Sequence, residues 1–230
     1  MPRHAAFVRI THWIHAISFL CLVLSGIAIL LAYPRLHWGE SGTVGSPSLI
    51  DLPLPFVLEL GIRGPGRYLH FLSTWVVLFC GSAYVAMGVR AKHFSSDLLP
   101  PKQDFTWTTL RRTIADHLHF RRPRGEEEWR YNLLQRISYL AVVFVLSPFM
   151  FLTGLAMSPM VTSVFPWLVE IWGGRQSART LHFFGFVLLV IFFLVHIVMV
   201  VGAGFVRHCA AMITGYSKTK GAIQRLEQEP

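Results

Sequence analysis

Four histidines stand inside or at the ends of long apolar runs, where a polar side chain is costly and indicates function. Two of them, His182 and His196, are fourteen residues apart in one run, so on a helix both imidazoles leave the same face. The helical rise of about 1.5 Å per residue separates them by ~21 Å. That distance spans much of a hydrocarbon core ~30 Å thick. The spacing predicts two stacked sites that bind a metal or a haem.

The elements that position these histidines are predicted to be membrane spans. The chain of 230 residues is 53% hydrophobic and only 14% charged, whereas a soluble domain carries nearer a quarter charged residues. Four apolar runs are long enough to cross a bilayer, at about residues 10–32, 67–90, 133–157 and 177–206. The predicted fold is an all-α four-helix transmembrane bundle forming one domain over residues 1–230. Because Arg9, His12 and His15 interrupt the start of the first run, we interpret it as a retained span rather than a signal peptide.

The distribution of basic residues predicts the topology. Sixteen of the 21 Lys and Arg residues lie in segments on the side of the N-terminus, and five lie in the outer segments. This positive-inside bias places both termini in the cytoplasm, with an outer loop at 33–66, a cytoplasmic loop at 91–132 and a cytoplasmic tail at 207–230. The net charge of +9 therefore reflects topology, and we expect no nucleic-acid partner.

In this topology the four histidines form two pairs at matched depths. His70 pairs with His182 near the outer face, and His12 pairs with His196 near the inner face. A six-coordinate haem iron takes two axial ligands, and neutral imidazole serves well. The sequence thus predicts two haems, each with two histidine ligands. Since both axial positions would be filled, oxygen binding is not expected.

Three arginines and one glycine support this interpretation. Arg-x-x-His occurs at Arg9, Arg67 and Arg179, each one turn before its histidine on the watery side. A forked guanidinium suits a haem propionate, although arginines snorkelling at span ends give the same pattern. Gly26 follows His12 by fourteen residues on the same helical face. The missing side chain there leaves room for a flat macrocycle or allows close helix packing.

Other chemistries fit less well. His15 lies one turn from His12 and could replace it as a ligand, or contact a quinone or a propionate; we favour His12, which is nearer the inner face and has Arg9 one turn away. The three cysteines form no Cys-x-x-Cys pair, which argues against covalent haem and thiolate-held clusters. Zinc or a di-metal centre lacks its ligands, and a transporter would usually add Asp or Glu within the spans, where this chain has none.

The first span carries a family resemblance. Arg-x-x-His-Trp-x-x-Ala-x-x-Phe-x-x-Leu-x-x-Ser-Gly at Arg9–Gly26 resembles the bacterial di-haem cytochrome b subunits, of the cytochrome b561 type, of formate dehydrogenase, nickel–iron hydrogenase and thiosulfate reductase. The fourteen-residue histidine spacing of the last span is similar too. Residues 33–39 and 172–182 look most like the thiosulfate reductase branch.

The resemblance implies a function and partners. It implies that His12/His196 and His70/His182 bind two b haems, and that a quinone (ubiquinone or menaquinone) binds near the inner haem, with His15 and Arg136 as candidates. We expect a multi-pass subunit of the bacterial inner membrane. It would carry electrons between the quinone pool and a periplasmic redox enzyme, which the resemblance suggests is a molybdopterin enzyme of the sulfite-oxidase type. The alternatives are a stand-alone haem oxidoreductase that acts on superoxide or ferric iron with quinone, and a transporter.

Overall fold

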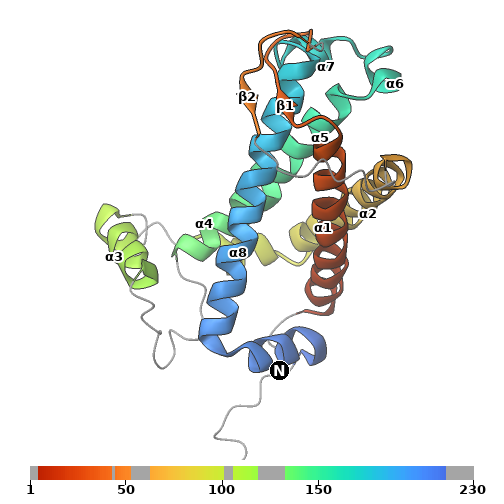
Figure 1. The fold of residues 1–230 in the computed structure, drawn as a ribbon. Helices are drawn as coiled ribbons and strands as arrows, with labels where there is room; N and C mark the ends of the chain where they lie inside the picture. Colours follow the sequence, from red (N-terminus) through yellow and green to blue (C-terminus); the bar gives the residue numbers. More distant parts are fainter. Residues whose placement is uncertain (1–4, 43–44, 53–62, 101–105, 119–132, 216–230) are drawn as a thin grey trace, which may run out of the picture. The chain divides into compact units, whose positions relative to one another are not determined.

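The computed structural model describes residues 5–42, 45–52, 63–100, 106–118 and 133–215 (Figure 1). Within these residues, four helical segments are long and apolar enough to cross a membrane. They are α1 (Ala6–Ala32), α2 (Arg63–Arg90), the segment Leu133–Ala156 and α8 (Arg175–Thr214). The prediction of an all-helical protein with four spans is confirmed. The parts of the predicted loops and tail at 53–62, 119–132 and 216–230 lie outside the described residues.

The third span is built from three pieces. It comprises α4 (Leu133–Ala141), the π-helical turn η4 (Val142–Leu146) and α5 (Ser147–Ala156). Proline lacks an N–H and its ring collides with the carbonyl four residues earlier, so a helix must adjust locally around Pro148. The π turn directly before that proline is such an adjustment. The Ser147 hydroxyl donates to the Val142 carbonyl at 2.7 Å.

The last span extends beyond its predicted end. α8 continues past residue 206 to Thr214 and contains one non-helical residue, Gly204, with φ 106° and ψ 85°. In the part of the chain that the structure describes, a Cβ at Gly204 would meet nothing within 4 Å. The backbone conformation therefore favours glycine there, and crowding plays no part.

Short elements connect the spans. The two-residue strands β1 (Arg35–Leu36) and β2 (Ile50–Asp51) pair antiparallel after α1. After α2 come the π-helical η1 (Phe94–Leu98) and α3 (Trp107–Leu118), and α6 (Pro159–Thr162) and α7 (Trp167–Glu170) precede α8.

The chain divides into two compact units, and the four histidines divide with it. The His12 unit consists of Met1–His15, Cys80–Ile137 and Phe193–Pro230, and it contains His12 and His196. The His70 unit consists of Ala16–Phe79 and Ser138–Phe192, and it contains His70 and His182. Each predicted pair therefore belongs to a single unit.

Candidate functional site

In the His70 unit, α2 and α8 bring two imidazoles close together. The ring centroids of His70 and His182 are 6.4 Å apart, with the planes at 59°. An imidazole nitrogen lies about 1.2 Å from its ring centre and binds a first-row metal ion at about 2.0–2.1 Å. Two imidazoles on opposite sides of one ion then have ring centres about 6.4–6.6 Å apart. The observed separation fits one ion between these two rings.

Hydroxyl groups lie behind both rings. Ser25 Oγ of α1 is 3.0 Å from His70 Nδ1, and Thr153 Oγ1 of α5 is 2.9 Å from His182 Nδ1. Each hydroxyl also lies close to the carbonyl oxygen four residues earlier, at 2.6 Å for Ser25 and 2.8 Å for Thr153. Such short O···O contacts require a proton, and only the hydroxyl has one to give. Each hydroxyl therefore donates to its carbonyl and accepts from the imidazole Nδ1–H.

These hydrogen bonds select one tautomer of each imidazole. With the proton on Nδ1, the Nε2 atom of a neutral ring keeps its lone pair. That lone pair is what an imidazole offers to a metal. Both rings of the pair are thus prepared to bind an ion through Nε2.

A glycine follows each of these hydroxyl residues and lies beside the ring. A Cβ added to Gly26 would stand 3.6 Å from His70 Cε1, and one added to Gly154 would stand 3.5 Å from His182 Cε1. In both cases the imidazole is the only group among the described residues that the added atom would meet within 4 Å. A longer side chain would fill the space beside the ring, so the two glycines leave room for a flat group bound there.

The His12 unit holds the second pair at nearly the same spacing. The ring centroids of His12 and His196 are 6.3 Å apart, with the planes at 53°. The Trp13 and His12 rings are perpendicular, with their centroids 5.2 Å apart. Trp13 Nε1 donates to the Met212 carbonyl at 3.2 Å. The Nδ1 atom of His12 is buried and has no hydrogen-bond partner among the described residues. The separation of this pair is within about 0.1 Å of the range expected for one ion, and the atoms around Nδ1 of His12 differ from those around the rings of the His70 pair.

His15 faces another helix. Its Nδ1 lies 2.7 Å from the Thr11 carbonyl and 3.6 Å from Cys80 Sγ of α2. A Cβ added to Gly81 would stand 3.4 Å from His15 Nε2. Of the two histidines on α1, the structure brings His12, and not His15, to His196.

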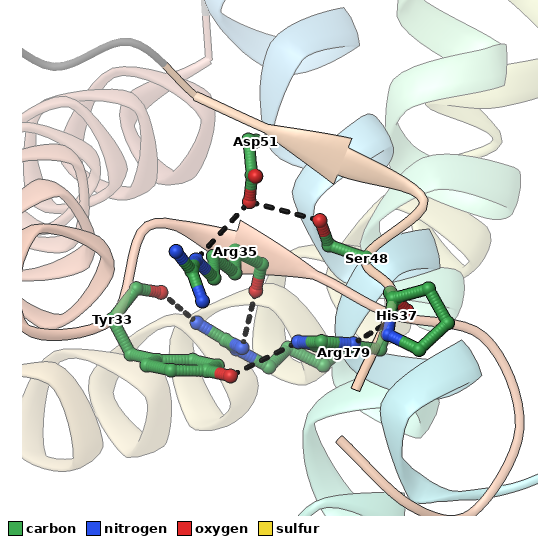
Figure 2. Close-up of polar contacts among 7 residues, drawn as sticks. Tyr33, Arg35, His37, Ser48, Asp51 and Arg179 are labelled. Carbon is green, nitrogen blue, oxygen red and sulfur yellow. Dashed lines mark hydrogen bonds and ion pairs between the residues drawn. The ribbon is translucent and has the colours of Figure 1, made fainter. Parts of the chain in front are cut away.

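The predicted arginines have differing surroundings. Arg9 Nη1 donates to the Ile213 carbonyl at 2.6 Å. Arg179 donates from Nη1 to the Arg35 carbonyl at 2.8 Å and from Nη2 to the Tyr33 carbonyl at 2.5 Å, with its guanidinium 5.2 Å from the Tyr33 ring centre (Figure 2). Arg67 is exposed near the start of α2. In this structure Arg9 and Arg179 therefore bind backbone carbonyls.

Arg136, the other predicted quinone contact, lies on α4. Its Nη1 donates to the Leu99 carbonyl at 3.1 Å, just after η1. This bond ties α4 to the segment that follows η1. The described contacts of His15 are instead with α1 and α2.

The segment after α1 docks on the N-terminus of α8. The Gly39 carbonyl accepts from the Gln176 and Ser177 N–H groups at 3.0 and 3.3 Å, and Glu40 Oε2 accepts from the Arg175 N–H at 3.0 Å. These acceptors satisfy N–H groups that a helix start leaves open, and the carboxylate complements the helix dipole. The contact fixes the beginning of the helix that carries His182.

A close backbone approach and buried bonds secure this contact. Gly174 has φ +118°, and a Cβ there would collide with the Gly39 backbone. The Thr180 hydroxyl donates to the carbonyl of buried His37 at 2.6 Å. The His37 Nε2 lies 3.0 Å from the Tyr33 hydroxyl. Figure 2 shows Tyr33 and His37 together with the Arg35–Asp51 ion pair of 3.2 Å, which joins β1 to β2.

Each histidine pair offers two imidazoles, and a metal centre bound there would need a group that supplies the remaining ligands. Among the described residues, no cluster of three or more His, Cys, Asp or Glu side chains could hold a metal ion. Two imidazoles are too few for a bare ion in a tetrahedral protein site. In haem the macrocycle supplies four further ligands, so the residues present fit this group.

Comparison with known proteins identifies the family. The model of the family described as prokaryotic cytochrome b561 matches residues 3–215. The chain belongs to the prokaryotic cytochrome b561 family. Membership implies haem b as the cofactor. It also identifies the four-span protein as a prokaryotic membrane cytochrome.

Individual relatives of this cytochrome cover most of its length. A putative protein-methionine-sulfoxide reductase subunit, YedZ1, of Azospira oryzae is 29% identical over 221 residues, which is 93% of this chain and 96% of that protein. A probable Ni/Fe-hydrogenase B-type cytochrome subunit of Cupriavidus necator is 23% identical over 203 residues, covering 84% of this chain and 76% of that protein. No solved structure matches the chain.

Three residues of this cytochrome were missed by the sequence analysis. Ser25, Thr153 and Gly154 lie against the ligand-type imidazoles, yet none was a candidate. A signal was present, because the same hydroxyl–glycine dipeptide occurs in two apolar runs, as Ser25-Gly26 and Thr153-Gly154. Hydropathy alone does not indicate which helix faces such a dipeptide.

Proposed function

We propose that this chain is the membrane-anchoring cytochrome b subunit of a redox complex. It carries electrons through two b haems between a periplasmic redox enzyme and the quinone pool. The observation that carries this proposal is the pair of facing imidazoles in each unit, at 6.4 and 6.3 Å between ring centroids. Family membership supports it, because the family consists of b-type cytochromes.

The histidine pairs would hold the two haems. His70 and His182 would bind one iron, and His12 and His196 the other. Bound haem supplies the one-electron chemistry, and the protein supplies ligands, orientation and exclusion of water. Two imidazole ligands at each haem would leave its iron no open position for a substrate, so these residues suit a haem that supplies electron transfer alone.

Two arginines are suited to the haem propionates. Arg67 has an exposed guanidinium one turn from His70. Arg9 keeps a buried Nε donor without a partner among the described residues, one turn from His12. Guanidinium groups bind carboxylates through paired donors. Arg179, whose terminal nitrogens hold the carbonyls of Tyr33 and Arg35, would act mainly by fixing the start of α8.

The quinone would bind in the His12 unit. The bond between His15 Nδ1 and the Thr11 carbonyl makes Nδ1 the donor and leaves the lone pair on Nε2. A neutral imidazole in that form can accept a proton from a quinol hydroxyl as electrons leave for the haem. Arg136 is a second candidate contact. Ubiquinone and menaquinone have the same reacting groups, so both are candidates.

The partner would be a catalytic redox subunit. The relatives are named as subunits of a protein-methionine-sulfoxide reductase and of Ni/Fe hydrogenases. These names support a catalytic redox partner in general, and the resemblance of residues 33–39 and 172–182 to the thiosulfate reductase branch is what favours a periplasmic molybdopterin enzyme. The proposed complex therefore links such an enzyme to the membrane.

Haem analysis of the purified protein tests the proposal. We expect two b haems per chain, full reduction by a membrane quinol analogue, and co-purification of a molybdopterin-containing subunit from native membranes. A folded protein with no b haem, or with haems that quinol does not reduce, would refute the electron-transfer role. Two quinol-reducible haems with activity toward superoxide or ferric chelate in the absence of any partner would favour a stand-alone oxidoreductase.

A further inference from the structure

We propose that Ser25 and Thr153 are positioning residues whose hydroxyls orient both ligands of the His70 pair and lower the reduction potential of the haem bound there. The proposal rests on the proposed ligation of that haem by His70 and His182. It adds two residues outside the ligand set, each acting through the imidazole that it contacts.

The structure contains the same arrangement twice, built from different helices. Ser25-Gly26 of α1 serves His70 of α2, and Thr153-Gly154 of α5 serves His182 of α8. In each case the hydroxyl bonds Nδ1 at 2.9–3.0 Å and the next glycine lies against Cε1. Two unrelated helix pairs sharing all of these contacts indicate a common requirement at the two rings.

Each hydroxyl is placed to donate to a carbonyl of its own helix and to accept from the ring. Ser25 Oγ lies near the carbonyls four and three residues earlier at 2.6 and 3.2 Å, and Thr153 Oγ1 lies near its equivalents at 2.8 and 3.1 Å. Its one proton is therefore directed along its own helix. Ser25 is 2% exposed and Thr153 is fully buried, so water does not compete for the bond to Nδ1.

Hydrogen bonding at Nδ1 changes the ligand strength of Nε2. A ligating histidine whose other nitrogen donates a hydrogen bond is oriented and becomes a more basic ligand. A more basic ligand stabilises ferric iron more than ferrous iron, so it lowers the reduction potential. Donation by the hydroxyl to its carbonyl strengthens its acceptance from Nδ1–H, because linked hydrogen bonds reinforce one another.

A purely local role for the hydroxyls makes a different prediction. Serine and threonine in helices often bond the carbonyl one turn earlier, and that bond alone would explain their burial. Removing the hydroxyl would then alter helix stability and leave the haem potential unchanged. Thr74 is the matched control, because its hydroxyl donates to the His70 carbonyl at 2.9 Å in the same unit without a bond to the ring.

The test is a potentiometric titration of the full-length, haem-loaded protein. Ser25→Ala and Thr153→Val remove one hydroxyl each, and Thr74→Val is the control. The conservative variants Ser25→Thr and Thr153→Ser keep a hydroxyl at each position. We expect each removal to raise the potential of one haem by an amount on the order of a tenfold change in the ferric-to-ferrous ratio, ~59 mV for one electron. The potential of the other haem should match the wild type, and so should both potentials in the control and in the two conservative variants.

Spectroscopy of the ferric protein provides the second readout. Because the hydroxyls also orient the rings, the low-spin ferric EPR signal of the shifted haem should change in both removal variants. Unchanged potentials and EPR signals in Ser25→Ala and Thr153→Val, with two haems bound, would overturn the proposal. So would equal shifts of both haems.

Failure of this proposal and failure of the proposed function give different results. His70→Ala identifies the haem in question, because it should remove that haem alone. A wild-type protein without haem, or a His70→Ala protein that keeps both haems, would refute the ligation itself. Two haems with normal His70 dependence and unshifted hydroxyl variants would refute only the role of Ser25 and Thr153.

Discussion

The two histidine pairs have almost the same ring spacing and different surroundings. The His70 pair has a hydroxyl acceptor behind each ring and a glycine beside each ring. In the His12 pair, Nδ1 of His12 is buried without a partner among the described residues. The comparison separates two properties: ring spacing determines which group can be held, and the atoms behind the rings determine its orientation and electronic state.

The ends of α8 are also held in different ways in the two units. Its start in the His70 unit is capped by Gly39 and Glu40, which belong to the segment after α1. Its last turns in the His12 unit receive side-chain donors from α1, namely Arg9 and Trp13. Backbone docking in one unit and side-chain donors in the other should make the two pairs respond differently to mutation.

The largest difference in haem retention between the two pairs should come from filling the space beside one imidazole ring. Gly154→Leu places a branched side chain against His182, so we expect loss of the haem at the His70 pair and retention of the other. Gly154→Ala should keep both haems, because its Cβ would lie at an ordinary contact distance of 3.5 Å from Cε1. Haem content per folded chain measures the effect. Gly202→Leu is the control, since none of the described neighbours lies within 4 Å of a Cβ at Gly202.

The second largest difference between the two units should be in thermal stability, when the docking of the segment after α1 is disturbed. Gly174→Ala combines an unfavourable φ with a collision against the Gly39 backbone, and should destabilise the His70 unit by at least ~2 kcal/mol. Thermal melting followed at the haem absorbance should show the haem of the His70 pair released at lower temperature. Gly202→Ala should leave melting within ~0.5 kcal/mol of the wild type. Equal loss at both pairs would show that the docking contact does not act on one unit alone.

The smallest effect on haem should come from His15. Because His15 faces α2 and His12 faces His196, His15→Gln should retain both haems and their reduced spectra, whereas His12→Gln should lose one. Reduction by a quinol analogue should slow severalfold in His15→Gln if it accepts the quinol proton. Stopped-flow reduction of the haems measures this. Loss of a haem in His15→Gln would instead make His15 a ligand.

The sequence predicted what depends on local pattern. Apolar runs predict spans because hydropathy is a property of each segment, and the fourteen-residue spacing places His182 and His196 on one face because helical geometry is regular. Matching depths then paired His70 with His182 and His12 with His196. The structure places the members of each pair at 6.4 and 6.3 Å between ring centroids.

The remaining features depend on which helices are neighbours and how each is rotated. Helical spacing places Gly26 on the face of His12, but the contact of Gly26 with His70 requires α1 to pack against α2 at that level. The partner of Thr153 likewise depends on the rotation of α5, just after the π turn at Val142–Leu146. Arg179 was expected at a propionate. Its carbonyl partners, Arg35 and Tyr33, are 144 and 146 positions away in the sequence.

The most direct test of the account is to determine which haem each ligand variant loses. His70→Ala and His182→Ala should lose the same haem, recognised by the potential and spectrum of the one that remains. His12→Ala and His196→Ala should lose the other. If His70→Ala and His196→Ala remove the same haem, or if a folded single variant loses both haems, the pairing proposed for this cytochrome is contradicted.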